Sequence, residues 1–185
     1  QKVIEFTPSL AITDKQRQDI CADALKIAGA VNYRSAGTVE FLVDKNGDHY
    51  FIEMNPRVQV EHTVTEVVTG IDIVQSQILI AEGYTLDSDE INIKSQNDIS
   101  LNGYAIQCRI TTEDPENDFA PDTGVIEQYR SASGYGIRLD GGNGFTGSVI
   151  SPYYDSLLVK LTASARTFTG AADKAIRALR EMTIK

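Results

Sequence analysis

The stretch that decides the fold reads GTVEFLVDKNGDHYFIEMNPRVQVE and occupies residues 37–61. It contains two runs in which apolar and polar residues alternate, at residues 38–43 and 49–54. Between them stands the dipeptide Asn46-Gly47, which between such runs is a strong signal for a two-residue type I′ turn. The stretch therefore predicts a β-hairpin.

The turn predicts which side chains face each other. Counting outward from it pairs Lys45 with Asp48 and Glu40 with Glu53, and puts both glutamates on one face of the hairpin. Facing residues have Cβ atoms about 4.5–5.5 Å apart, where like charges are destabilising. A hard divalent cation would remove that penalty, because Mg²⁺ commonly takes one or two carboxylates together with substrate phosphates. The alternative is two solvated acids on an exposed face.

Further polar side chains continue the face that carries Glu53. In an extended chain alternate positions point to the same side, and the next four such positions hold Asn55, Arg57, Gln59 and Glu61. Pro56 cannot donate to a strand ladder, which favours an edge or an irregular extended segment there. Such a row makes a poor core face and fits a site for phosphates, a metal ion and a proton transfer.

The string FIEMNPRVQVEHTVTE, at residues 51–66, resembles the active-site strand of the ATP-grasp domain in biotin carboxylases. The resemblance continues through YAIQCRI (104–110), TEDP (112–115) and SPYYDSLLVKL (151–161), in the order that the family shows. The sequences NPR and HTVTE are more similar to those in the biotin carboxylase part of pyruvate carboxylases than to those in acetyl-CoA carboxylases. Several separate motifs therefore carry a resemblance that spans essentially the whole chain.

The resemblance implies an α+β fold in two parts. Residues 1–90 would be the C-terminal part of an ATP-grasp domain, an antiparallel sheet with helices. Residues 91–185 would be an incomplete biotin carboxylase C-terminal domain, mostly antiparallel β with helices. The polar, weakly periodic segment 84–100 marks the expected boundary. The chain opens on Gln1 without Met, and we expect it to be a piece of a longer polypeptide.

Local patterns predict individual elements. The T-x-x-Q of residues 13–16 has the form of a capping box and starts a helix, and a second helix begins at Asp72 and ends at Gly83. Residues 104–110 alternate like a half-buried strand. The last helix, at about residues 169–182, is expected to pack through Ala172, Ile176 and Leu179.

Composition excludes several classes of function. Among 185 residues 42% are hydrophobic and 23% charged, which is typical of a globular chain with a core. The net charge of −9, without a basic patch, argues against nucleic-acid binding. The sequence contains no run of about 18 apolar residues, so no membrane span is predicted. Cys21 and Cys108 are predicted to be buried free thiols in a reducing compartment. We expect the bacterial cytoplasm or, in a eukaryote, the mitochondrial matrix.

The resemblance also implies roles for the hairpin residues. Mg²⁺, or Mn²⁺, would be held on the ATP phosphates by Glu40, Glu53 and Asn55. Bicarbonate would be oriented by Arg57, Gln59 and the backbone of Val60. Glu61 would be the general base that takes the bicarbonate proton.

Four residues outside the hairpin receive roles by the same resemblance. Lys2 would add positive charge at the reacting group, and Arg109 would bind the ureido oxygen of biotin with its planar, permanently charged guanidinium. Asp155, in the YYDS motif, would lie on the biotin side, although a turn-capping carboxylate fits it equally well. Arg138 would lie toward the dimer contact. From the residues alone, a solvated lysine and a surface arginine are the simpler interpretations of Lys2 and Arg109.

The function that this resemblance implies is carboxylation of biotin with MgATP and bicarbonate, within pyruvate carboxylase. The partners would be a biotin carrier domain and further copies of the parent protein, and this chain alone is not expected to turn over. Alternatives are the biotin carboxylase of acetyl-CoA carboxylase and another ATP-grasp ligase, such as a carbamoyl-phosphate synthase, against which RVQVEH and YYDS argue. A metal-stabilised module without catalysis is the alternative from a different class.

Overall fold

The computed structural model describes residues 2–154 and 156–185 and has a mixed α+β fold with antiparallel strands, as predicted. Its contacts divide the chain into two compact units, which are described separately. The first unit combines the described residues up to Thr7 with Thr63–Val68 and Leu101–Lys185. The second unit combines Pro8–His62 with Thr69–Ser100. The predicted division into residues 1–90 and 91–185 concerns family domains and stays a prediction.

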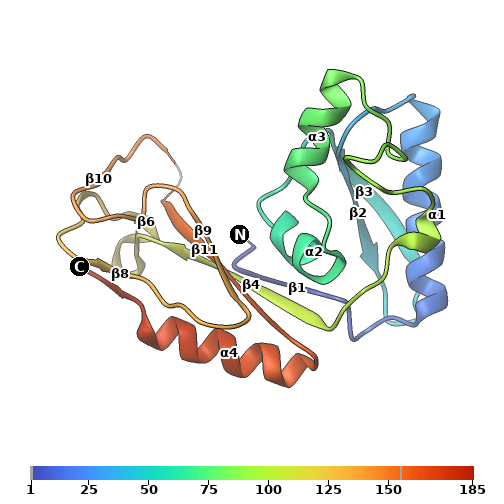
Figure 1. Ribbon diagram of the computed structural model, residues 1–185. Helices are drawn as coiled ribbons and strands as arrows, with labels where there is room; N and C mark the ends of the chain where they lie inside the picture. The colour runs from blue at the N-terminus through green and yellow to red at the C-terminus, as the bar shows by residue number, and fades with distance from the viewer. Residues whose placement is uncertain (1, 155) are drawn as a thin grey trace. The chain divides into compact units, whose positions relative to one another are not determined.

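The second unit contains the predicted hairpin and the two capped helices. Its elements are α1 (Asp14–Ala30), β2 (Thr38–Val43), β3 (His49–Asn55), α3 (Ile73–Glu82) and the 3₁₀ turn η1 (Gln96–Asp98) (Figure 1). Thr13 and Gln16 form the expected capping box at the start of α1. Asp72 accepts a hydrogen bond from the backbone of Gln75 at the start of α3, and Gly83 ends that helix in the left-handed conformation. These helix ends are confirmed. They were predictable because each depends on residues only a few positions apart.

The hairpin pairs Glu40 with Glu53, as predicted, but its loop and its strand register differ from the predicted ones. The loop closes between Asp44 and Asp48 rather than between Lys45 and Asp48, since Asp44 N donates to Asp48 O at 2.9 Å. The carboxylate of Asp44 favours the longer loop, because its Oδ1 accepts backbone hydrogen bonds from residues 46 and 48 at 2.8 and 3.0 Å. A bulge at Ile52 then adds one residue to β3, and the shift restores the predicted pairing of the glutamates.

The first unit is built on a four-stranded antiparallel sheet. Its strands are β1 (Ile4–Thr7), β4 (Tyr104–Thr111), β11 (Leu157–Ala165) and β9 (Ile137–Gly141), in that spatial order (Figure 1). Shorter elements complete the unit: β5 (Glu113–Asp114), η2 (Pro115–Asn117), β6 (Ala120–Pro121), β7 (Gly124–Val125), β8 (Tyr129–Arg130), β10 (Val149–Ile150) and β12 (Thr183–Ile184).

One face of this sheet packs against α4 (Phe168–Glu181). The buried residues of the helix are Ala171, Ala175 and Ala178, which lie in one cluster with sheet residues such as Cys108 and Leu161. The predicted packing was confirmed for Ala172, which is partly buried against this cluster, and was wrong for Ile176 and Leu179, which are 48% and 39% exposed. The small side chains let the middle of the helix approach the sheet closely, and Phe168 at its start also packs against this cluster.

The other face of β4 is covered by α2 (His62–Thr69). Val64 and Val68 of this helix pack on Ala105, and Ala105 and Gln107 have no exposed surface. The prediction of a half-buried strand was therefore wrong. Residues of β4 that alternate toward α2 are as deeply buried as those that face α4, although one of them is a glutamine.

The two cysteines differ in exposure. Cys108 is buried, and burial raises the pKa of its thiol, with a smaller contribution from the charge of Glu5. Cys21 is exposed, so the prediction that both thiols are buried was wrong for this residue.

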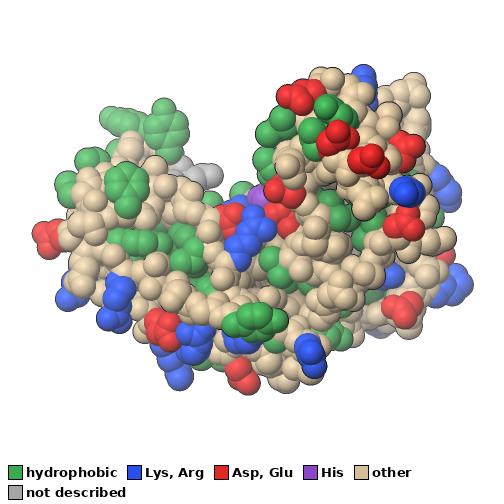
Figure 2. Space-filling model, in the orientation of Figure 1, with side chains coloured by type: hydrophobic (Ala, Val, Ile, Leu, Met, Phe, Trp, Pro, Cys, Tyr) green, Lys and Arg blue, Asp and Glu red, His purple; other side chains and the backbone are tan. Residues whose placement is uncertain are grey.

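Apolar side chains remain on the surface of both units (Figure 2). On the hairpin they include Leu42, Tyr50, Phe51 and Ile52, each more than half exposed. Within the described residues no single helix is long and apolar enough to cross a bilayer, and α2 and α3 reach that length only when taken together across a break.

The positive φ of Gly103 generates a prediction about stability. Gly103 and Gly70 have φ angles of 74° and 73°, but a Cβ at Gly103 would collide with the carbonyl oxygen of Ala165, whereas no described neighbour lies within 4 Å of one at Gly70. We expect Gly70→Ala to lower the free energy of unfolding by about 1–2 kcal/mol, the cost of the left-handed conformation. Gly103→Ala should cost about 1–3 kcal/mol more, because backbone must move.

Amide hydrogen exchange in β4 and β11, together with urea unfolding, measures both effects in the protein that carries this chain. Equal losses in the two variants would contradict the close approach of Gly103 to β11.

Candidate active site

Glu40 and Glu53 converge on one amide group. Asn55 Nδ2 donates to Glu53 Oε1 at 2.9 Å and to Glu40 Oε1 at 3.3 Å. One nitrogen therefore lies within hydrogen-bond distance of both carboxylates. The structure thus brings together all three residues that the sequence predicts as metal ligands.

Gln59 joins this group from the segment after β3. Its Nε2 donates to Glu40 Oε1 at 2.9 Å, and the residue is only 9% exposed. Its Oε1 is buried and accepts no hydrogen bond from any described residue. A buried acceptor of this kind is rare in native proteins.

The chain after Asn55 is not extended, so the predicted row along one strand face was wrong. β3 ends at Asn55, and Arg57 N donates back to Asn55 O at 2.8 Å. A second turn, with His62 N donating to Gln59 O at 3.2 Å, carries Val60 and Glu61 into α2. These turns, and not strand alternation, bring Gln59 to Glu40.

Arg57 and Glu61 lie in these two turns. Arg57 is exposed, and its guanidinium contacts Asn55 Oδ1 at 3.4 Å and Val58 O at 3.3 Å. Glu61 is half-buried in the turn before α2. Arg57 is thereby placed at the edge of the carboxylate group, and the role of Glu61 as a base stays a prediction.

The donor set fits a hard cation that phosphates help to bind. No group of three His, Cys, Asp or Glu side chains that could hold a metal occurs in the described part of the chain. Glu40, Glu53 and Asn55 instead offer two carboxylates and one amide oxygen, if the amide of Asn55 turns its oxygen inward. Mg²⁺ commonly accepts so few protein ligands when substrate phosphates complete its shell.

Lys2 and Arg109 line one cavity of about 340 Å³ in the first unit, which we call the β1–β4 cavity. Its other lining residues are Val3, Thr111, Glu113 and Phe119. The structure therefore brings together Lys2 and Arg109, the two cationic residues that are predicted to act at the reacting group and on biotin. Asp155 lies outside the described residues. Its neighbour Ser156 donates to Glu113 Oε1 at 3.1 Å.

Arg109 has a partner that sequence reasoning missed. Its Nη2 lies 2.6 Å from Glu5 Oε1, and the two side chains are 18% and 12% exposed. Glu5 stands 104 positions earlier in the chain, and only the pairing of β1 with β4 brings the two residues together. The only sequence signal was the position of Glu5 as an acid between the apolar residues Ile4 and Phe6.

Arg138 is also paired within its own unit. Its guanidinium binds Glu66 at 2.7 Å and Asp140 at 2.8 and 2.9 Å. The hydrogen bonds that Arg138 donates to Asp140, and then to Glu66, raise the pKa of Arg138 above its ordinary value, and partial burial opposes them. The side chain remains 37% exposed, and its predicted place at a dimer contact stays a prediction.

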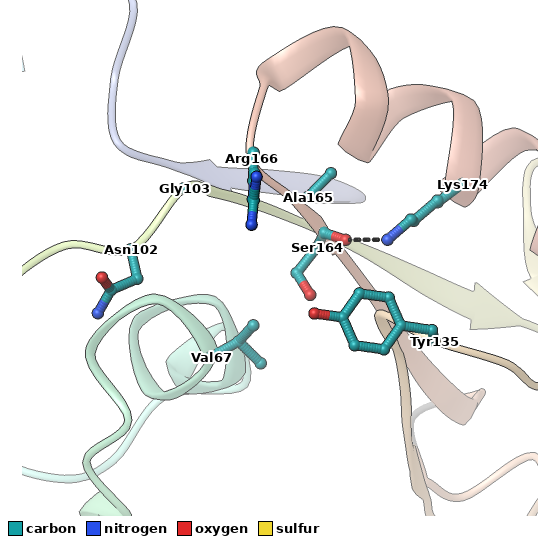
Figure 3. A pocket seen from close by; sticks show the side chains of 8 residues that line it. All are labelled: Val67, Asn102, Gly103, Tyr135, Ser164, Ala165, Arg166 and Lys174. Carbon is teal, nitrogen blue, oxygen red and sulfur yellow. Dashed lines mark hydrogen bonds between the residues drawn. The ribbon is translucent and has the colours of Figure 1, made fainter.

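A second cavity of the first unit, of about 630 Å³, lies between the start of α4 and α2 (Figure 3). Its lining residues are Val67, Asn102, Gly103, Tyr135, Ser164, Ala165, Arg166 and Lys174. Lys174 Nζ donates to Ser164 O at 2.9 Å and lies 4.8 Å from the centre of the Tyr135 ring. None of the predicted catalytic or ligand-binding residues lines this cavity.

Two protein families match the chain. Residues 1–89 match the family described as "Carbamoyl-phosphate synthase L chain, ATP binding domain". Residues 107–185 match the family described as "Biotin carboxylase C-terminal domain". The second match favours a biotin carboxylase over a carbamoyl-phosphate synthase.

Curated relatives include the pyruvate carboxylases of Bacillus subtilis and Staphylococcus aureus. They are 60% and 59% identical to this chain over its whole length. The chain spans 16% of the length of each.

Solved structures with the same fold include a complete multifunctional pyruvate carboxylase from Rhizobium etli, which is 56% identical with a TM-score of 0.94. The alignment covers all of this chain and 18% of that one. The biotin carboxylase domain dimer of the Hydrogenobacter thermophilus 2-oxoglutarate carboxylase, in complex with MgADP and bicarbonate, is 46% identical with a TM-score of 0.92, and the alignment covers all of this chain and 39% of that one.

The first match includes the hairpin with its converging carboxylates, and it also includes Lys2. The second match includes Arg109, which lines the β1–β4 cavity together with Lys2. The chain therefore belongs to the biotin carboxylase family and is similar throughout to the biotin carboxylase region of pyruvate carboxylases.

Proposed function

We propose that this chain forms part of the biotin carboxylase component of a pyruvate carboxylase, an ATP-dependent ligase. That component would use MgATP and bicarbonate to carboxylate biotin on a carrier domain of the same polypeptide or complex. Similarity to pyruvate carboxylases over the whole of this chain supports the proposal, as does the relative solved with MgADP and bicarbonate. Because the chain spans only 16% of such relatives, we expect it to be inactive alone.

The observation that carries the proposal is the convergence of Glu40, Glu53 and Asn55. Facing carboxylates repel one another across a hairpin, so an apolar or mixed pair would be favoured for stability alone. A cation on the ATP phosphates removes that repulsion. Mg²⁺ bound there would neutralise charge that develops on the transferred phosphoryl group.

The neighbouring residues suit the handling of bicarbonate. Arg57 can donate two parallel hydrogen bonds to a planar anion, and Gln59, which donates to Glu40, would help to orient bicarbonate. Glu61 would take the bicarbonate proton as the anion attacks ATP, a role that general bases fill in many enzymes. The hairpin and the turns that follow it would thus provide the metal ligands, the residues that bind bicarbonate and the general base.

The β1–β4 cavity suits the biotin side of the reaction. As the N1 proton of biotin leaves, negative charge develops on the ureido oxygen, and a guanidinium stabilises such charge when it is already in place. Arg109 would bind that oxygen, and Lys2 would add positive charge near the carboxyl group that is transferred. Asp155 would act on the same side.

The biotin carboxylase of an acetyl-CoA carboxylase remains the alternative within the family. We favour pyruvate carboxylase because relatives with 56–60% identity over the whole chain carry that name. We also propose a homo-oligomer, since a relative forms a biotin carboxylase domain dimer. Arg138 would contact the partner through the part of its side chain that remains exposed.

The assignment of Glu61 is tested with Glu61→Gln in the full-length parent enzyme. We expect bicarbonate-dependent, biotin-stimulated ATP cleavage to fall by about 10²-fold or more, the size of effect that a missing general base produces. Glu82→Gln is the matched control, because Glu82 is an exposed acid at the end of α3. Glu66 is unsuitable as a control because it is buried against Arg138. Full activity in Glu61→Gln would refute the role of Glu61.

The metal assignment is tested with Glu53→Gln in the same enzyme. We expect the Mg²⁺ concentration for half-maximal ATP cleavage to rise by about tenfold or more, because the affinity of such sites follows the number of charged ligands. Asp48→Asn, an exposed acid of the same hairpin, should leave this concentration unchanged. An unchanged Mg²⁺ requirement in Glu53→Gln would place the metal elsewhere.

A further inference from the structure

We propose that Glu5 positions the guanidinium of Arg109 for its contact with biotin. A buried chain of hydrogen bonds in turn fixes the carboxylate of Glu5, and its members are Gln107, Thr63 and Thr162. The inference rests on the proposed function, because it takes Arg109 as the residue that binds biotin. Glu5 is not among the described residues that line the β1–β4 cavity, so its role is positioning and not catalysis.

The first step is the ion pair between Glu5 and Arg109. Glu5 Oε1 lies 2.6 Å from Arg109 Nη2, and both side chains are largely buried. A guanidinium carries five N–H donors in one rigid plane. The contact at Nη2 therefore restrains the direction in which that plane faces.

The second step is the bond from Gln107 to the other oxygen of Glu5. Gln107 Nε2 donates to Glu5 Oε2 at 3.1 Å, and the two residues stand directly opposite each other in β4 and β1. The reverse orientation of the amide would set its oxygen against the carboxylate, where neither group can donate. Oε2 thus accepts a hydrogen bond while Oε1 forms the ion pair with Arg109, so rotation of the carboxylate would disturb both contacts.

The third step is the pair of threonines that fixes the amide of Gln107. The Thr63 hydroxyl donates to Gln107 Oε1, and the hydroxyl oxygens of Thr63 and Thr162 lie 2.7 Å apart. A hydroxyl has one proton to donate, so Thr162 is the donor to Thr63. All three side chains are at most 1% exposed, and reversing any bond would leave a buried polar group without a partner.

The simpler explanation is that this chain of bonds only stabilises the sheet. Buried ion pairs, however, add little net stability, and apolar side chains of similar volume often serve as well. The chain ends on Arg109, one of the two cationic residues of the β1–β4 cavity. A positioning role explains why a charged pair stands at this end of a buried polar row.

The test uses the full-length enzyme that contains this chain, with free biotin as the probe substrate. Bicarbonate-dependent ATP cleavage is measured against biotin and against MgATP for Glu5→Gln, Arg109→Gln and the double variant. We expect Glu5→Gln to lower kcat/KM for biotin by about tenfold or more, while the KM for MgATP changes less than about twofold, as for a residue that supports a binding group. Glu127→Gln, an exposed acid of the same unit, is the control.

The double variant separates positioning from general stabilisation. If Glu5 acts through Arg109, Glu5→Gln has no further effect on kcat/KM for biotin once Arg109 is replaced. Additive losses in the double variant, or equal losses for biotin and MgATP, would overturn the inference. If Arg109→Gln itself leaves kcat/KM for biotin unchanged, the proposed biotin role of Arg109 fails. If Arg109→Gln loses activity and Glu5→Gln does not, only the positioning role fails.

Glu5→Asp provides the test in case Glu5→Gln does not fold. It retains the charge and shortens the side chain by one methylene, so we expect a loss in kcat/KM for biotin smaller than that of Glu5→Gln. A loss confined to biotin supports positioning, and an equal loss for MgATP contradicts it.

Discussion

The amide of Gln107 has no exposed surface and must find all its hydrogen-bond partners inside the protein. Glu5 on β1 and Thr162 on β11 stand opposite it, and Thr63 reaches it from α2. An unpaired buried polar group costs about 1–3 kcal/mol. The register of β4 with both neighbouring strands and the place of α2 on the sheet thus depend on one side chain. A slip of one residue would put Ile106 in this polar position.

Helix ends were predictable because their causes are local. The capping box of Thr13 and the glycine at the end of α3 need only residues within one turn of the chain. The burial of both faces of β4 was not predictable in this way. Its alternation is that of a half-buried strand, and only the distant α2 turns the polar face into an interior one. Likewise, α4 packs through Ala171, Ala175 and Ala178, and the expected contacts of Ile176 and Leu179 do not form because both side chains are exposed.

The hairpin illustrates how a correct pairing can follow from an incomplete argument. The count from Asn-Gly assumed a two-residue loop, but Asp44 captures two backbone amides and lengthens the loop by one residue. Ile52 then bulges out of β3 and returns Glu40 to its place opposite Glu53. Bulges are frequent beside active sites, where they re-aim a side chain. Here the bulge sits next to Glu53, where it compensates the longer loop and keeps the two carboxylates on one face.

Arg109 shows the limit of a sequence interpretation most clearly. It was identified from its motif, but its guanidinium pairs with an acid from a distant segment, Glu5. Arg138 likewise contacts Glu66 of α2, in addition to Asp140 on its own strand. A permanently charged side chain on a sheet face needs such a counter-ion to be buried. The counter-ion also fixes which way the plane of donors points. A motif supplies the charge, and the tertiary pairing supplies its direction, on which binding of a planar ligand depends.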